Sequence, residues 1–231
     1  MENEGWHYLP GNSIVRNSKT EVLYEDDQEQ FISNTNPDLT PEEVRQIQII
    51  DIVRLVGAES DFESPANNIF RAVNRFAVEY TNNGQTEKRR PDVLPFVNGM
   101  PLCVIELKKT ADTNATIYDA WEQINIQCWR DIPHLLHYFP LVCISDGVKA
   151  RLGTVRTPYE HFYAWRRVNN EDKVSTLPFE EMETMIKGGL QPTKILGNLI
   201  YFQDREYDDN ERDVVCRYPQ FFAARMSRKL V

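Results

Sequence analysis

The amino-acid sequence predicts an α/β protein with a mixed β-sheet core flanked by helices. Apolar, strand-like runs recur between residues 70 and 155, and a segment with helical spacing interrupts them at 112–132. The resulting order of strand, strand, strand, helix, strand, strand is typical of a mixed sheet with helices packed on it. The 231 residues, 41% hydrophobic and 26% charged, are enough for one large globular domain or one domain with appendages.

The first helix is predicted to begin within the segment Leu39–Val44. Thr40 is placed to cap it, Pro41 takes the first helical position, and Glu43 follows three residues after the cap. Gly57 marks its end. The apolar residues that recur at helical spacing are Val44, Ile47, Ile50 and Val53.

Three strand-like segments follow this helix. Residues 70–80 are predicted to form a strand with polar interruptions, and residues 81–90 a loop. Residues 91–97 and 101–109 are predicted to form two strands joined at Asn98-Gly99, a turn signal.

The second helix is predicted over 112–132, with Asp112 or Asn114 as its cap and Pro133 closing it. One stripe of this helix is apolar, which predicts that it packs on the sheet. The stripe consists of Ile117, Trp121, Ile124 and Cys128.

The remaining elements are a hairpin and a weaker C-terminal part. Residues 140–147 are predicted to form a buried strand that pairs with 149–155 across Asp146-Gly147. Residues 178–190 have helical spacing, and 204–213 are predicted to form an acidic loop. A domain boundary is expected between 185 and 215.

The composition bounds the cellular setting. No run approaches the roughly 20 apolar residues of a membrane helix. The start of the sequence, MENEGWHYLPG, lacks the basic and apolar stretches of a signal peptide. The four cysteines are far apart in sequence, without a CxxC pair, so a reducing, cytoplasmic setting without disulfides is expected. They are Cys103, Cys128, Cys143 and Cys216.

The formal net charge of −9 does not favour nucleic acid as a partner of the whole surface. Any contact with DNA must depend on a local basic patch, or on other chains or domains. The best candidate is Lys88-Arg89-Arg90, with Lys108-Lys109 beyond it in the sequence. A short charge run is also common on ordinary solvated surface, and the sequence does not decide between these readings.

The segment 101–109 places charged residues on one face of a strand. Alternation puts Val104, Glu106 and Lys108 on one side, and the core-type residues Cys103, Ile105 and Leu107 on the other. Whether Asp92 shares the face of Glu106 depends on the connection at Asn98-Gly99. A two-residue loop would pair Asp92 with Ile105, whereas an odd loop with a G1 bulge reverses this parity. We expect the odd loop, which sets Asp92 beside Glu106.

Two carboxylates at a strand end suit Mg²⁺, which prefers oxygen ligands and keeps several waters. Lys108 on the same face can orient water or stabilise charge on a phosphate. These are the parts of metal-assisted phosphodiester cleavage. The alternative is that Glu106 and Lys108 form an exposed charge pair and Asp92 is a turn-side residue.

The short sequence segments around these residues resemble those of a known family. RPDVLPFVNGMPLCVIELKK, a helix with AWEQI, then IP and SDG, resemble the N-terminal nuclease region of the R subunit of type I restriction–modification enzymes. This family has the PD-(D/E)xK restriction-endonuclease-like fold. The resemblance implies that Asp92 and Glu106 are metal ligands for Mg²⁺ and that Lys108 is the catalytic lysine. It also implies a QxxxY motif on the following helix, where Gln123 matches and Gln127 replaces the tyrosine.

The resemblance extends toward both ends of the chain. GWHYLPG is similar to a family strand that follows a helix bearing one more metal-site acid, and here only Glu2 and Glu4 precede it. CRYPQFFAARMSRKLV resembles the segment before the phosphate loop of a helicase-like motor, with Gln220 at the place of the adenine-reading glutamine. No GxxxxGK[ST] loop occurs in the sequence, so ATP hydrolysis is not expected of it.

The family therefore implies a nuclease domain at 1–185 and a linker at 186–231 that leads toward a motor absent from this sequence. It implies cutting of double-stranded DNA after ATP-driven translocation, with methyltransferase and specificity subunits as partners. Two alternatives stay open. One is a weakened nuclease fold that serves as a DNA-binding or docking platform, and the other is a stand-alone repair-type nuclease.

Overall fold

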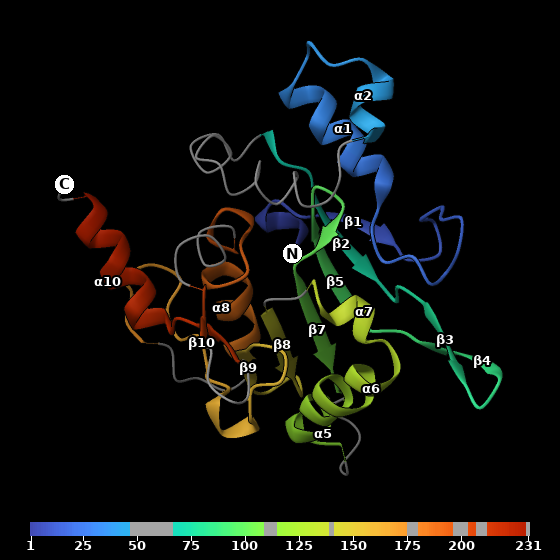
Figure 1. Cartoon of the computed structure of the whole chain (residues 1–231). Coiled ribbons are helices and arrows are strands. Elements are labelled where there is room, and N and C mark those ends of the chain that lie inside the picture. Colours follow the sequence, from blue (N-terminus) through green and yellow to red (C-terminus); the bar gives the residue numbers. More distant parts are fainter. Residues whose placement is uncertain are drawn as a thin grey trace.

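The central feature of the computed structural model is a seven-stranded sheet (Figure 1). The structure describes residues 1–46, 67–108, 115–138, 141–174, 180–195, 203–206 and 212–229. The strands lie in the order β1-β2-β5-β7-β8-β9, and the short β6 pairs with β5. Their bounds are β1 His7–Pro10, β2 Phe70–Asn74, β5 Val93–Val97, β6 Met100–Pro101, β7 Cys103–Leu107, β8 Leu141–Ser145 and β9 Ala150–Gly153.

The sheet is mixed, as predicted. β1 and β2 run parallel, as do β7 and β8. The pairs β2–β5, β5–β6, β5–β7 and β8–β9 are antiparallel. The predicted hairpin across Asp146-Gly147 is confirmed, and every residue of β8 is buried.

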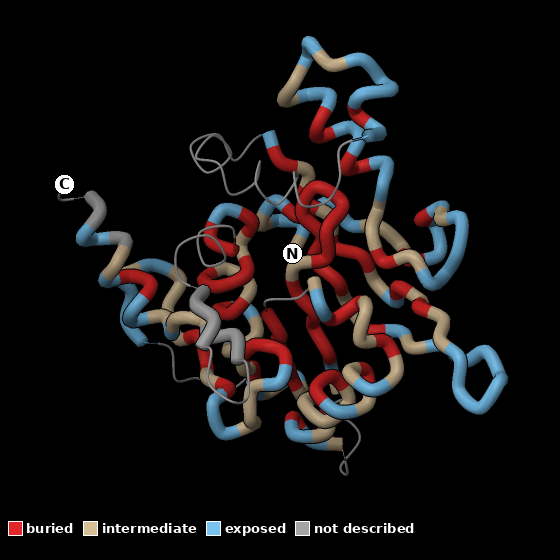
Figure 2. Tube along the Cα trace, viewed as in Figure 1, coloured by how far each residue is buried: buried red, intermediate tan, exposed pale blue. Residues whose placement is uncertain are grey.

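Both faces of the sheet are covered, which gives a three-layer core (Figures 1 and 2). One hydrophobic cluster joins strand residues such as Ile105 and Cys143 to Phe31, Met185 and Phe221 on helices α1 (Glu25–Thr35), α8 (Glu181–Gly188) and α10 (Tyr218–Lys229). The second cluster joins Val104 and Ile144 to Ile117, Ile124 and Leu135 on the helices between β7 and β8. The α/β architecture with flanking helices is therefore confirmed, and it is the arrangement expected of a PD-(D/E)xK-like fold.

The predicted helix start at Leu39–Val44 is confirmed as α2 (Pro41–Gln46). Glu43 Oε2 accepts hydrogen bonds of 2.8 Å from the backbone N–H and the hydroxyl of Thr40, which closes a capping box. Val44 is buried. The later positions of the predicted stripe and its end (Ile47, Ile50, Val53 and Gly57) lie outside the described residues.

Residues 70–90 differ from the prediction of one strand and a loop. The chain leaves the main sheet at Arg75, which has a φ of 50°. It then forms a separate hairpin of β3 (Val78–Asn82) and β4 (Gln85–Arg89). Asn83 and Gly84 both have positive φ, as a two-residue type I′ turn requires. The strand predicted over 70–80 is thus confirmed only in part, as Phe70–Asn74 and the start of β3, and the loop predicted over 81–90 was wrong. The residues of β4 are polar and mostly exposed, so they lack the apolar alternation that predicts a strand.

The helical segment after β7 has three parts: α5 (Ile117–Glu122), the π-helical η3 (Gln123–Cys128) and α6 (Trp129–Asp131). Thr116 caps it in a capping box with Asp119. Asp112 and Asn114, the expected caps, lie outside the described residues. Three of the four stripe residues are buried, and Trp121 is half-buried. The segment ends before Pro133 as predicted, and Pro133 begins α7 (Pro133–Leu136).

The C-terminal part packs against the same sheet. The predicted helix within 178–190 is confirmed as α8. Leu190, Ile195, Phe221 and Phe222 belong to the hydrophobic cluster that contains Ile105 and Trp165, so residues on both sides of position 185 share one core. Strands β10 (Gln203–Glu206) and β11 (Arg212–Val215) form an antiparallel pair where an acidic loop was expected, and residues 207–211 lie outside the described residues. The division at 185 stays a prediction.

The structure also has two short 3₁₀ turns, η1 (Glu2–Glu4) and η4 (Tyr159–His161). Among the helices described, none combines the length and apolar character that crossing a membrane requires.

Candidate active site

Asp92 and Glu106 lie opposite one another on adjacent strands. Val93 pairs with Ile105 in the antiparallel β5–β7 ladder, so the preceding Asp92 is level with the following Glu106. Opposed residues of an antiparallel pair share one face of the sheet. The backbone N–H of Leu107 also donates a 2.9 Å hydrogen bond to Asp92 Oδ2, which ties the two strand ends together.

Asp92 and Glu106 come to share a face of the sheet by a different route from the one predicted. Asn98 and Gly99, with φ of 50° and 76°, form a two-residue turn that pairs Val97 with Met100, so the expected odd loop was wrong. Between Phe96 and Val93 there are two residues, whereas their partners Pro101 and Ile105 enclose three. The extra residue is a bulge in the second arm, and it places Asp92 beside Glu106. The prediction that Asp92 lies beside Glu106 was thus correct, but the predicted cause, an odd loop at Asn98-Gly99, was wrong.

The two faces of β7 divide the core as expected, up to its last residue. Cys103 and Ile105 belong to one hydrophobic cluster and Val104 to the other. Leu107, expected in the core, is 41% exposed because β7 ends there, at the edge of the covered sheet. Glu106, by contrast, is only 3% exposed. The alternative of an exposed Glu106–Lys108 surface pair is therefore excluded.

Glu106 is a buried carboxylate with one oxygen unsatisfied. Its Oε1 lies 3.5 Å from Lys108 Nζ, and its Oε2 is buried without a hydrogen-bond partner among the described residues. Burial, and then the charge of Asp92, raise the pKa of Glu106 to about 7, against the opposing effect of Lys108. A carboxylate so placed is ready to receive a cation.

Lys108 joins this carboxylate to the helical layer. Its Nζ donates to Glu106 Oε1 and also to Gln123 Oε1. Its backbone N–H donates a 2.8 Å hydrogen bond to the carbonyl of Ser145, which fixes the residue beside the end of β8. The four residues expected from the sequence at this site, Asp92, Glu106, Lys108 and Gln123, are therefore brought together.

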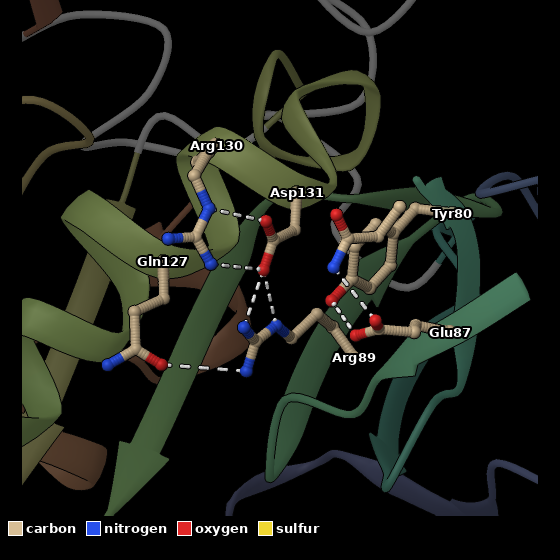
Figure 3. A network of polar contacts seen from close by, with 7 residues as sticks. Tyr80, Glu87, Arg89, Gln127, Arg130 and Asp131 are labelled. Carbon is tan, nitrogen blue, oxygen red and sulfur yellow. Dashed lines mark hydrogen bonds and ion pairs between the residues drawn. The ribbon is translucent and has the colours of Figure 1, made fainter. Parts of the chain in front are cut away.

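The two helix glutamines have different neighbours. Gln123 begins the π-helical segment η3 and faces Lys108, whereas Gln127 Oε1 accepts a long 3.5 Å hydrogen bond from Arg89 (Figure 3). Insertions of π-helix change which side chains share a helix face, and they occur frequently at functional sites. Here the segment contributes Gln123 to the site and Gln127 to a neighbouring network.

That network holds the chain just before Asp92. The Arg89 Nε donates a 2.8 Å hydrogen bond to Asp131 Oδ2, and Arg130 Nε donates one of 2.7 Å to Asp131 Oδ1 (Figure 3). The hydrogen bonds of Arg130, and then those of Arg89, lower the pKa of Asp131 to about 2. Arg89 and Asp131 are 42 positions apart, and no sequence signal predicted their contact.

The donor set fits a hard divalent cation such as Mg²⁺. The unsatisfied Glu106 Oε2 is a vacant acceptor beside a second carboxylate, that of Asp92. Among the described residues no group of three or more His, Cys, Asp or Glu side chains is placed to hold a metal. Mg²⁺ needs only one or two protein carboxylates, with waters and substrate phosphate as further ligands, whereas a structural zinc site needs four.

The other candidate residues lie elsewhere. Glu2 and Glu4 form η1 before the start of β1, whereas Asp92 lies beside Asn74, at the end where β1 finishes with Pro10. The length of β1 thus separates these two acids from Asp92. Gln220 lies in the first turn of α10, where its Oε1 accepts a 2.8 Å hydrogen bond from the N–H of Arg217.

Comparison with known proteins places the chain in a family. Residues 1–161 match the family model described as the type I restriction enzyme R protein N terminus. The type I restriction enzyme HindI endonuclease subunit of Haemophilus influenzae is 35% identical over 179 residues, which are 76% of this chain and 16% of that protein. The putative type I restriction enzyme MjaIXP endonuclease subunit of Methanocaldococcus jannaschii is 29% identical over 177 residues, 71% of this chain and 17% of that protein.

The chain thus spans about a sixth of the length of these two relatives. The matched residues include the whole of the strand pair that carries Asp92, Glu106 and Lys108, and Gln123 as well. The chain belongs to the family of N-terminal regions of type I restriction enzyme R proteins.

Proposed function

We propose that this chain is a Mg²⁺-dependent endonuclease domain that cleaves phosphodiester bonds of double-stranded DNA. The observation that carries the proposal is the unsatisfied, buried oxygen of Glu106 beside Asp92 and Lys108. Burying a carboxylate oxygen without a hydrogen-bond partner costs free energy, and a functional role is one common explanation for such a group.

Each residue has a distinct role in this proposal. Asp92 and Glu106 hold the cation. A bound Mg²⁺ supplies Lewis-acid polarisation of a phosphoryl oxygen and activation of water. Lys108 has three ammonium protons, of which Glu106 and Gln123 accept two, so one is available to a phosphate oxygen. Gln123 fixes the ammonium in this position.

The role of the whole protein is a further part of the proposal. The curated relatives are named endonuclease subunits of type I restriction enzymes. We propose that cleavage follows ATP-driven translocation by a motor outside this chain, and that methyltransferase and specificity subunits select the DNA. In that assembly Gln220 would contact ATP, which requires its side chain to leave the backbone of Arg217.

The proposal is tested in a restriction complex whose R subunit carries this chain. Asp92→Asn, Glu106→Gln and Lys108→Ala should each abolish DNA cleavage and leave ATP hydrolysis unchanged. The matched control is Glu183→Gln, which removes an exposed carboxylate paired with Lys187 and should cut as the wild type does. Normal cleavage by any of the three site variants would remove the role assigned to that residue.

A second candidate function is a nuclease-fold platform that binds or docks without cutting. The position of Glu2 and Glu4 away from Asp92 favours it, because neither of these two acids joins Asp92 and Glu106 at the site. Calorimetric titration of the chain with Mn²⁺ separates the two candidates. Binding that Glu106→Gln abolishes supports the nuclease, and the absence of carboxylate-dependent binding supports the platform.

A further inference from the structure

The basic patch Lys88-Arg89-Arg90 is largely engaged within the protein. Lys88 Nζ lies 3.2 Å from Glu79 Oε1, and Arg89 binds Asp131. Arg90 is exposed, and within the described ranges its guanidinium makes no hydrogen bond, ion pair or ring contact. Of the three cations, Arg90 alone is therefore free to bind a partner, and it stands two residues before Asp92.

A second free guanidinium belongs to Arg75, at the same end of the sheet. The β2–β5 ladder ends with Asn74 opposite Val93, and the N–H of Arg75 then donates a 2.9 Å hydrogen bond to the carbonyl of Asp92. Arg75 is exposed, and no described residue accepts a hydrogen bond from its guanidinium or pairs with it. The chain thus brings two arginines without a side-chain partner among the described residues to the two sides of Asp92, one along the sequence and one across the sheet.

The backbone of Arg75 is held in a conformation that arginine disfavours. Its φ of 50° lies in the left-handed region, which is unfavourable for most residues that carry a Cβ atom. Gly11 lies against this bend, and its N–H donates a 2.8 Å hydrogen bond to the carbonyl of Asn74. Glycine or asparagine would fit this position with less strain.

The other non-glycine residues with positive φ have evident local reasons. Asn83 and Asn98 each begin an Asn-Gly turn. Arg156 donates its N–H to Asn125 Oδ1 at 2.7 Å, and its guanidinium lies 5.5 Å from the ring centre of Trp129. Arg75 has no such side-chain contact in the described part of the protein, so no local interaction accounts for an arginine at this position.

We infer that Arg75 and Arg90 bind phosphates of the DNA strand that enters the Asp92–Glu106–Lys108 site. The inference rests on the proposed function. It explains how a protein with a net charge of −9 can bind DNA at the end of the sheet that carries Asp92. Guanidinium groups bind phosphate oxygens in a bidentate manner, and such contacts position the backbone without reading its sequence.

The test is the salt dependence of DNA binding by the 231-residue chain. A short fluorescently labelled duplex is titrated in Ca²⁺ in place of Mg²⁺, so that binding is measured by anisotropy without turnover. The slope of log Kobs against log salt concentration is negative, and each phosphate contact contributes about 0.9 to its magnitude, which is the quantity compared below. Arg75→Ala and Arg90→Ala should each reduce that slope by about 0.9 and weaken binding about tenfold at low salt.

Three further variants separate phosphate binding from a structural role. Arg75→Lys and Arg90→Lys should keep the slope, because the charge remains. Arg75→Gly should weaken binding as much as Arg75→Ala, but leave the unfolding midpoint unchanged or raise it, because glycine relieves the backbone strain. Arg130→Ala is the matched control, since it removes an exposed arginine that is already paired with Asp131 and should not change the slope.

An unchanged slope in Arg75→Ala and Arg90→Ala overturns the inference, as does the absence of any binding by the wild type at low salt. A loss of stability in Arg75→Gly that parallels its loss of binding would assign Arg75 a structural role instead. The outcome is distinct from that of the proposed function. If the wild type cuts DNA but the slopes of Arg75→Ala and Arg90→Ala equal that of the wild type, only the inference about the two arginines is refuted. If the slopes change as expected but the wild type does not cut DNA, only the proposed nuclease activity is refuted.

Discussion

Glu106 Oε1 lies 3.5 Å from Lys108 Nζ, and the two side chains are only 4% and 18% exposed. The acid and the amine that follow one another on this strand therefore share a nearly dry environment. Because burial raises the pKa of Glu106 to about 7, the amine compensates only part of the cost of the charge. This imbalance has consequences that can be measured.

Glu106→Gln should stabilise the metal-free protein at alkaline pH. The pKa of Glu106 rises from 4.5 to about 7 on folding, so the folded state binds more protons between these values and the stability falls as the pH rises through them. Above pH 7 the loss amounts to about 3 kcal/mol, which glutamine avoids. Urea unfolding should thus show a more stable variant at pH 8 and a much smaller difference near pH 4.5. A variant less stable than the wild type at pH 8 would contradict this account.

Gln123→Ala should slow cleavage, whereas Gln127→Ala should not. Gln123 accepts from Lys108 Nζ, and without it the ammonium loses one of its two fixed partners. We expect kcat to fall about tenfold with KM little changed, which corresponds to the loss of one hydrogen bond to a charged group. Gln127 contacts only Arg89 among these groups, at 3.5 Å, so its variant is the control. Equal kcat values for the two variants would remove the positioning role of Gln123.

Arg89→Ala should destabilise the fold more than Arg130→Ala does. Asp131 is 7% exposed, and Arg89 at 27% is its better-buried partner, whereas Arg130 is 66% exposed. We expect a loss of about 1–3 kcal/mol for Arg89→Ala and a clearly smaller loss for Arg130→Ala, because solvent screens the exposed arginine. Because the pKa of Asp131 is lowered from 3.8 to about 2, its ion pairs stabilise the fold above pH 3.8 and weaken as the pH falls toward 2. Urea unfolding at pH 7 and pH 3 should therefore show the difference between wild type and Arg89→Ala shrinking in acid.

Gly99→Ala should be far more damaging than Gly84→Ala, although both glycines occupy Asn-Gly turns. Gly84 has a φ of 79° and nothing within 4 Å of an added Cβ atom, so its variant incurs only the left-handed cost of about 1 kcal/mol. At Gly99 the added atom would lie 2.2 Å from the carbonyl oxygen of Tyr24, which adds overpacking and a total cost of about 3 kcal/mol or more. Denaturant midpoints test the order, and similar midpoints would show that the segment at Tyr24 yields.

The sequence predicted those parts of the fold that local signals specify. The capping box at Thr40, the buried run of β8 and the turn at Asp146-Gly147 each depend on a few adjacent residues, and each was confirmed. The β3–β4 hairpin was missed, although Asn83-Gly84 is a typical sequence for a type I′ turn. Its strands bury too few side chains to show an alternation of apolar and polar residues.

The sequence predicted which residues come together at the candidate site, but not the structural features that bring them together. The bulge lies next to Pro95, which has no N–H for the ladder, and a proline in a central strand was a signal for such an irregularity. The burial of Glu106 depends on the helices that cover β7, and the Arg89–Asp131 ion pair depends on how the hairpin meets α6. These tertiary contacts leave no mark in a short stretch of sequence.

The bulge between β6 and β7 also limits how this hairpin can change during evolution. A single residue gained or lost between the aspartate and the glutamate would carry one acid through to the opposite layer, whereas a change of two would preserve their meeting. Length differences at this connection should accordingly come in even steps, or else in compensating pairs of insertion and deletion. The number of residues between Asp92 and Glu106 is therefore restricted, even where the identities of those residues can vary.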